Sequence, residues 1–231
     1  MTKKLARVTL FGLDCVEISR LIQVAEICQK DFEFEKVKLL TSLESNHSNI
    51  VKIDPINTIE AYNQFMIKKM NDYIDTDFVL VIQYDGFILN PEAWTDEYLK
   101  YDYIGAPWHK DGHFIVGNGG FSLRSKKLLE ILQKDDSLQI PADEPEDTFI
   151  CQEKREHLES KGIKFAPVDL ARQFALEANE KDGVEWTNQF GFHGLKWTDI
   201  SKWLKEHPEY KIDNPLDSWA LGVKERFKSN E

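Results

Sequence analysis

The chain has 231 residues, of which 42% are hydrophobic, so it is long enough to bury the core of one large domain. Its 29 basic and 40 acidic residues leave a net charge of −11, which argues against a nucleic-acid partner because phosphate contacts need a basic face. The three cysteines, Cys15, Cys28 and Cys151, are widely spaced without a C-x-x-C pair, which indicates a reducing compartment. We therefore expect one cytoplasmic domain over residues 1–231.

The sequence contains no membrane-spanning pattern. No apolar run reaches the roughly 18 residues that a membrane span needs. The apolar stretch 8–13 is stopped by Asp14 and is too short for a secretory signal. We expect no transmembrane segment. Peripheral contact with a membrane-bound acceptor is compatible with the sequence.

Strand and helix patterns alternate along the chain. Residues 78–82 are apolar throughout, which is typical of a strand covered on both faces. The run 57–60 resembles a helix N-terminus with a glutamate three residues after the cap. The alternation predicts an α/β fold with a central, twisted, mainly parallel sheet flanked by helices. Strands are predicted at 7–13, 34–41, 78–82, 103–106, 121–124 and 164–168, and helices at 17–30, from 59 onward, 125–133, 148–160, 197–206 and 218–227.

Asp85 follows the apolar strand 78–82 after a short gap. Open α/β sheets bind ligands at the carboxyl ends of their strands, so Asp85 is a candidate ligand for a hard cation such as magnesium or manganese. Gln83 is placed to orient water or a ribose hydroxyl beside it. The alternative is that Asp85-Gly86 simply forms a turn.

The run Gly117-Asn118-Gly119-Gly120 has two interpretations. Asn-Gly is a strong hairpin dipeptide. A backbone without side chains also lets a sugar or phosphate approach closely. The run matches neither the dinucleotide fingerprint nor the P-loop, because Phe121-Ser122-Leu123 reads as strand and no Gly-Lys-Ser/Thr follows.

Two further motifs carry candidate chemistry. The acidic run 143–147 precedes a predicted helix, where it either caps that helix or supplies a catalytic base from Asp147, Glu146 or Asp143. His193 lies between glycines and aromatic residues outside any clear helix, so it is either a surface residue or a metal ligand complementing Asp85.

Taken together, these motifs resemble a poorly characterised bacterial and fungal family of GT-A-type glycosyltransferases. The resemblance spans roughly residues 5 to 195, and the string 117–124, Gly-Asn-Gly-Gly-Phe-Ser-Leu-Arg, is its most specific part. The other matching strings are Gln-Tyr-Asp-Gly at 83–86, Tyr-Asp-Tyr-Ile-Gly-Ala-Pro-Trp at 101–108, Pro-Glu-Asp at 145–147 and Phe-Gly-Phe-His-Gly at 190–194.

The resemblance implies a GT-A-like single domain, a nucleotide-sugar donor and a divalent metal, manganese or magnesium. Asp85 stands at the last aspartate of the metal-binding Asp-x-Asp motif, and His193 resembles the C-terminal metal-binding histidine. Glu146-Asp147 resembles the acidic pair that supplies the base in inverting members. The sequence departs from the pattern at Gln83, which replaces the first aspartate and adds no charge, and this puts metal dependence in question.

We therefore expect an inverting, metal-assisted glycosyltransferase acting on a glycan or other hydroxyl acceptor. The alternatives are a catalytically inactive nucleotide- or carbohydrate-binding protein and a glycoside hydrolase. The expected donor- and acceptor-binding residues are Phe11, Gly12, Thr41, Tyr62, Lys68, Gln83, Trp108, Asn118, Gly119, Gly120 and Arg124.

Overall fold

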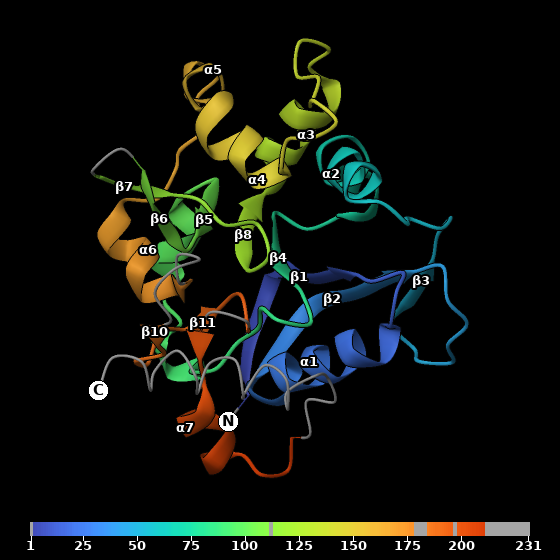
Figure 1. Cartoon of the computed structure of the whole chain (residues 1–231), viewed down its shortest axis with the longest axis vertical. Helices are drawn as coiled ribbons and strands as arrows, with labels where there is room; N and C mark the ends of the chain where they lie inside the picture. Colours follow the sequence, from blue (N-terminus) through green and yellow to red (C-terminus); the bar gives the residue numbers. More distant parts are fainter. Residues whose placement is uncertain (1, 111–112, 178–183, 196–197, 211–231) are drawn as a thin grey trace.

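A six-stranded mixed sheet forms the centre of the molecule (Figure 1). The computed structural model describes residues 2–110, 113–177, 184–195 and 198–210. The strand order is β3-β2-β1-β4-β8-β5, in which β1 to β4 run parallel and β8 is antiparallel to both β4 and β5. This arrangement confirms the predicted α/β fold with a mainly parallel sheet. The sheet strands are β1 Lys3–Leu13, β2 Phe32–Thr41, β3 Ile50–Lys52, β4 Phe78–Ile82, β5 Tyr103–Gly105 and β8 Ser122–Ser125.

The helices follow the predicted alternation in the first half of the chain. α1 connects β1 to β2, and α2 precedes β4, as parallel strands require crossover connections. The N-cap of α2 is Thr58, whose side chain accepts from the Ala61 N–H at 3.1 Å. The α-helices are α1 Ile18–Asp31, α2 Ile59–Lys68, α3 Lys126–Lys134, α4 Glu146–Thr148, α5 Arg155–Ser160, α6 Val168–Phe174 and α7 Ser201–Glu206; 3₁₀ helices lie at Met70–Tyr73, Pro91–Ala93 and Asp96–Lys100.

The apolar strand β4 supplies both faces of the sheet. Its side chains alternate, so Leu80 and Ile82 join one core with α1, while Val79 and Val81 join the other. Figure 1 shows α1 on one side of the sheet and α2 and α3 on the other. Burial on both faces explains why the strand has no polar residue.

Three short pairs of strands lie outside the main sheet. β6 and β7 form an antiparallel hairpin, whereas β9 pairs with β11, and β10 with β12, in parallel. Among the described residues, no helix is long and apolar enough to cross a membrane. The strands are β6 Pro107–Lys110, β7 His113–Val116, β9 Ala175–Leu176, β10 Val184–Glu185, β11 Gly191–Phe192 and β12 Thr198–Asp199.

Several predicted elements differ from the structure. The strand predicted at 164–168 is wrong, because only Phe165 bridges Tyr103 and Pro167 is the N-cap of α6. The helix predicted at 148–160 is broken into α4, a π-helix at Phe149–Glu153 and α5. The helix predicted at 197–206 begins only at Ser201, and the one predicted at 218–227 lies outside the described residues.

Candidate active site

A tight turn after β4 presents Asp85. Gln83 and Gly86 exchange both backbone hydrogen bonds at 3.0 Å, so Tyr84 and Asp85 occupy the two central positions. The turn interpretation of Asp85-Gly86 is therefore correct for the backbone. It does not use the carboxylate, since Asp85 Oδ1 is buried and has no hydrogen-bond partner among the described residues. A buried oxygen left unpaired costs free energy, which marks this atom as a candidate ligand.

The Gly117–Gly120 segment is not a hairpin turn. β7 pairs with β6, whereas β8 pairs with β4 and β5, so the segment joins two different sheets. Asn118 holds a left-handed conformation with φ 55°, and its Oδ1 accepts from the Phe121 N–H at 3.1 Å. A Cβ built on Gly119 would lie 2.3 Å from Glu146 Oε1, and one on Gly120 would lie 2.1 Å from His193 Nε2. The glycines are therefore required because two groups of side chains pack against bare backbone.

The acidic residues Glu146 and Asp147 begin α4 but have different partners. Glu146 is buried and pairs with the fully buried Arg124, whose Nη2 donates to its Oε1 at 2.9 Å. Arg124 Nη2 also donates to the Gly119 carbonyl at 3.2 Å. Asp147 instead accepts from the backbone N–H groups of Gly119 and Thr148, both at 2.8 Å. The pair thus consists of one carboxylate neutralised by a cation and one held only by amides.

Asp147 is the carboxylate suited to proton transfer. Burial and the neighbouring charge of Glu146 raise its pKa to about 6, against the opposing effect of the Gly119 N–H. A carboxylate with this pKa is ionised at neutral pH and is a better base than an ordinary aspartate. Glu146 already has Arg124 as a partner, and Asp143 is exposed.

His193 lies opposite Asp85, directly after β11. Its Nε2 is 3.6 Å from Asp85 Oδ1 and 3.1 Å from Gln83 Oε1, and its Nδ1 is 2.9 Å from Glu177 Oε1. Burial lowers the pKa of His193, but Asp85 and Glu177 outweigh this effect and raise it to about 9. The backbone fixes the pair as well, since the Gly194 N–H donates to the Asp85 carbonyl at 2.8 Å.

Asp85 and His193 fit a cation that needs few protein ligands. Asp85 Oδ1, which has no hydrogen-bond partner among the described residues, faces His193 Nε2 at 3.6 Å. A magnesium or manganese ion would take these two atoms as ligands after displacing the Nε2 proton of His193, with its other ligands from substrate and water. No cluster of three or more His, Cys, Asp or Glu side chains able to hold a metal ion is found in the part of the chain that the structure describes.

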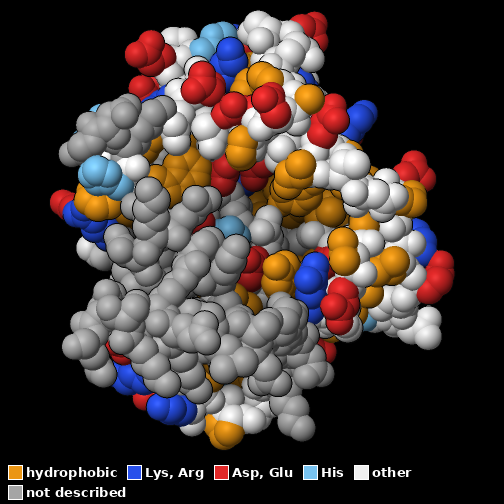
Figure 2. Space-filling view, viewed as in Figure 1, with side chains coloured by type: hydrophobic (Ala, Val, Ile, Leu, Met, Phe, Trp, Pro, Cys, Tyr) orange, Lys and Arg blue, Asp and Glu red, His pale blue; other side chains and the backbone are white. Residues whose placement is uncertain are grey.

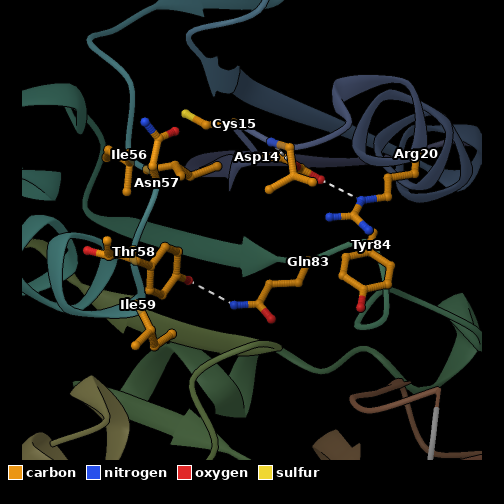
Figure 3. A pocket seen from close by; sticks show the side chains of 12 residues that line it. Asp14, Cys15, Arg20, Ile56, Asn57, Thr58, Ile59, Gln83 and Tyr84 are labelled. Atoms are coloured by element: carbon orange, nitrogen blue, oxygen red, sulfur yellow. Dashed lines mark hydrogen bonds and ion pairs between the residues drawn. The ribbon is translucent and has the colours of Figure 1, made fainter. Parts of the chain in front are cut away.

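A cavity of about 330 Å³ opens beside this turn, at the carboxyl ends of β1 and β4. Arg20 stacks its guanidinium 3.7 Å from the centre of the Tyr84 ring and pairs with Asp14 at 2.7 Å. Figure 3 shows these groups on one side of the cavity and residues 56–59 on the other, with Gln83 between them. Gln83 Nε2 donates to the Tyr62 hydroxyl at 2.8 Å, so the cavity is continuous with the Asp85 turn through Gln83. The space-filling view shows a hollow on this face with hydrophobic and acidic side chains round it (Figure 2).

Some predicted site residues lie elsewhere. Phe11, Gly12 and Thr41 belong to β1 and β2; Phe11 and Thr41 are fully buried, and Gly12 packs against Leu21. Lys68 donates from Nζ to the carbonyls of Leu132 and Asp135. The other predicted residues, apart from the exposed Asp143, lie together at the candidate site. They are Tyr62, Gln83, Asp85, Trp108, Asn118, Gly119, Gly120, Arg124, Glu146, Asp147 and His193.

Three site residues were not anticipated from the sequence. Arg20 and Tyr84 line the cavity, and Glu177 contacts both His193 and Trp108. Tyr84 lies within the Gln83–Gly86 motif, so the motif itself could have identified it as a site residue. Glu177 follows a two-residue strand in a charged stretch, and no local pattern distinguishes it from a surface glutamate.

The fold and site define an α/β protein with opposed acidic and imidazole groups at one end of its sheet. Residues 47–193 match the DUF5672 family, described as a protein of unknown function, and the chain belongs to this family. No curated protein sequence matches the chain.

Three solved structures resemble this chain distantly. The mannosyltransferase PcManGT from Pyrobaculum calidifontis, in complex with GDP-Man and Mn²⁺, is 13% identical with a TM-score of 0.47, and the match covers 71% of this chain and 55% of that one. The galactosyltransferase LgtC is 14% identical with a TM-score of 0.47, covering 92% and 99% of the two chains. The glycosyltransferase GlyE from Streptococcus pneumoniae TIGR4 is 10% identical with a TM-score of 0.47, covering 100% and 64%. This chain thus spans about half the length of the mannosyltransferase. At these scores the likenesses carry no argument about function.

Proposed function

We propose that this protein is an inverting glycosyltransferase that moves a sugar from a nucleotide-sugar donor to a hydroxyl acceptor. The observation that carries the proposal is the environment of Asp147. Its carboxylate is held by two backbone N–H groups, has no cationic partner among the described residues, and has a pKa of about 6. Asp147 packs against Gly119, and His193, which faces Asp85, packs against the next residue, Gly120.

Asp147 acts as the general base. Its carboxylate takes the proton of the acceptor hydroxyl while the acceptor oxygen bonds to the anomeric carbon. The bond from that carbon to the donor diphosphate breaks, and its electron pair leaves with the diphosphate. Attack from the side opposite the leaving group inverts the anomeric configuration. Glu146 remains ion-paired with Arg124, so it stays ionised and its charge helps to raise the pKa of Asp147.

Asp85 and His193 hold the diphosphate end of the donor. Both side chains are suited to a divalent cation, which when bound would neutralise the charge developing on the leaving diphosphate. Gln83 lines the cavity and also contacts His193, so it orients the donor where the cavity meets the Asp85–His193 pair.

The cavity beside Tyr84 receives the nucleoside. Its walls combine the apolar side chains of Leu13, Ile56 and Ile59 with polar groups, as ligand cavities commonly do. Val16 and Ile59, which also line the cavity, are 78% and 71% exposed, so a bound ligand would shield apolar surface from water there. We expect a planar base to bind between Ile59 and the stacked Arg20–Tyr84 pair, which line the same cavity.

A combined binding and turnover experiment tests the proposal. Nucleoside diphosphates should raise the melting temperature in the presence of manganese, because a ligand that binds only the folded chain stabilises it. Nucleotide sugars should release diphosphate, and Asp147→Asn should slow that release by about 10²–10⁴-fold while leaving the melting shift in place. Asp143→Asn, at an exposed acid of the same run, should behave as the native chain. Full turnover in Asp147→Asn would contradict the assignment of the base.

Gln83 favours one alternative, a nucleotide-sugar-binding protein without catalysis. Both ends of its amide are occupied, by the Tyr62 hydroxyl and by His193, and it adds no charge beside Asp85. A pure binder would show the melting shift and release no diphosphate from any donor in the same panel.

A further inference from the structure

Glu177 and His193 are brought together by the pairing of two very short strands. β9 and β11 run parallel, with Ala175 beside Gly191 and Leu176 beside Phe192. The next residue on each strand is Glu177 and His193, so the register places their side chains at the same end of the pair. The His193 N–H donates to the Leu176 carbonyl at 2.9 Å, which extends the pairing to this position.

The Glu177 carboxylate uses both oxygens. Oε1 lies 2.9 Å from His193 Nδ1, and Oε2 accepts from the Trp108 indole N–H at 2.5 Å. Asn118 Nδ2 lies 2.8 Å from the same Nδ1, but the amide nitrogen and a protonated Nδ1 cannot both donate to each other. A carboxylate only accepts, so His193 Nδ1–H donates its hydrogen bond to Glu177 Oε1.

The His193 ring is also held from its other sides. A Cβ on Gly86 would lie 2.9 Å from His193 Cδ2, and one on Gly120 would lie 2.1 Å from Nε2. The ring therefore has little room to rotate, and its Nε2 lies 3.1 Å from Gln83 Oε1 and 3.6 Å from Asp85 Oδ1. A histidine that binds a metal through one nitrogen commonly donates its other N–H to a carboxylate.

We infer that Glu177 is a positioning residue, which holds the Nδ1 hydrogen of His193 and keeps Nε2 directed at Asp85. Trp108 in turn fixes Glu177, so the β6–β7 hairpin is connected to the donor site through three side chains. The inference rests on the proposed function, in which His193 and Asp85 hold the diphosphate end of the donor.

A spectroscopic experiment tests the contact without any ligand. In a ¹⁵N-labelled chain, the ring N–H of His193 Nδ1 should give a downfield proton signal, identified by its loss in His193→Gln. In Glu177→Gln this signal should move upfield or disappear by exchange with water, and Trp108→Phe should shift it less. Glu156→Gln, an equal change of charge at an exposed position of α5, is the matched control and should leave it in place. A His193 signal unmoved in Glu177→Gln would overturn the inference.

Binding of Mn²⁺ alone, followed by electron paramagnetic resonance, separates the inference from the function on which it rests. The native chain should bind Mn²⁺, and Glu177→Gln should bind it about 10–100-fold more weakly. Glu177→Asp keeps a carboxylate and serves if the glutamine variant fails to fold; it should recover part of the affinity. Equal Mn²⁺ affinity in native, Glu177→Gln and Glu156→Gln chains would also overturn the inference. A native chain that shows the ring signal but binds no Mn²⁺ would instead overturn the metal part of the proposed function.

Discussion

Gly119 donates its backbone N–H to Asp147 Oδ2 at 2.8 Å, while its carbonyl accepts from Arg124 at 3.2 Å. One peptide segment therefore contacts both the proposed base and the cation that neutralises the base's neighbour, Glu146. Because the same segment also packs against His193 through Gly120, a change in its backbone affects both halves of the site.

The pH dependence of turnover should report Asp147. Its pKa is raised to about 6, so the ionised form that accepts a proton is lost as the pH falls below that value. The rate constant kcat/KM should fall about tenfold per pH unit on the acid side of pH 6. Asp143→Asn should show the same acid limb. A rate that is flat from pH 7 to pH 4.5 would contradict the role of Asp147.

Alanine at the two glycines should affect different halves of the site. Gly120→Ala places a methyl group on His193, which should displace the ring and weaken binding of the donor diphosphate. Gly119→Ala places a methyl group on Glu146 and Asp147, which should lower kcat by about 10²-fold, since small misplacements of a reacting group have effects of this size. Steady-state kinetics and diphosphate titrations on both variants, with thermal unfolding as the folding check, measure this. If both variants lost kcat and diphosphate affinity to the same extent, the acidic pair and His193 would not act as two separate halves of the site.

The Arg124–Glu146 pair should be required for stability. Both side chains are buried, and Arg124 Nη1 and Glu146 Oε2 have no hydrogen-bond partner among the described residues. Arg124→Met leaves the Glu146 charge alone in the interior and should lower the free energy of unfolding by about 3–5 kcal/mol. Adding Glu146→Leu should recover part of that loss in urea titrations.

An exposed ion pair supplies the matched control. Arg7 and Asp77 are 2.7 Å apart, close to the 2.9 Å of the Arg124–Glu146 pair, but their side chains are more than half exposed. Arg7→Met should cost less than about 1 kcal/mol, because solvent screens exposed pairs. Equal losses in Arg124→Met and Arg7→Met would mean that burial of the Arg124–Glu146 pair has no energetic consequence.

The rim of the cavity should contribute to binding and not to folding. Ile59 is 71% exposed, so Ile59→Ser should change the free energy of unfolding by no more than about 0.5 kcal/mol. If a base covers Ile59, the same change should weaken nucleoside diphosphate binding by about 3–10-fold, as expected for partial loss of one buried aliphatic side chain. Calorimetric titration measures this, with Phe114→Ser, an exposed apolar side chain of the β6–β7 hairpin, as the control.

Much of the first half of the fold could be predicted from local pattern. The unbroken apolar run Phe78–Ile82 identified a strand buried on both faces. The run 57–60 identified the start of α2, although the N-cap is Thr58 and not Asn57, the residue three before the glutamate. The break in the predicted helix 148–160 could not be anticipated, because the apolar spacing is compatible with a continuous helix. Tertiary packing of Phe149, Ile150 and Cys151 accompanies the π-helix there.

By itself the sequence determined which side chains were available for chemistry: a carboxylate after an apolar strand, a glycine run, an acidic pair and a histidine between glycines. Only the tertiary structure decided how they are partnered. It placed Arg124 in the interior against Glu146, left Asp147 to the Gly119 amide, and set Glu177 beside His193 through the register of β9 and β11. The physical reason is that local periodicity records which face of an element is buried. Partners 16 to 28 residues apart, such as Glu177 with His193 and Gly119 with Asp147, meet only when the elements that carry them pack together.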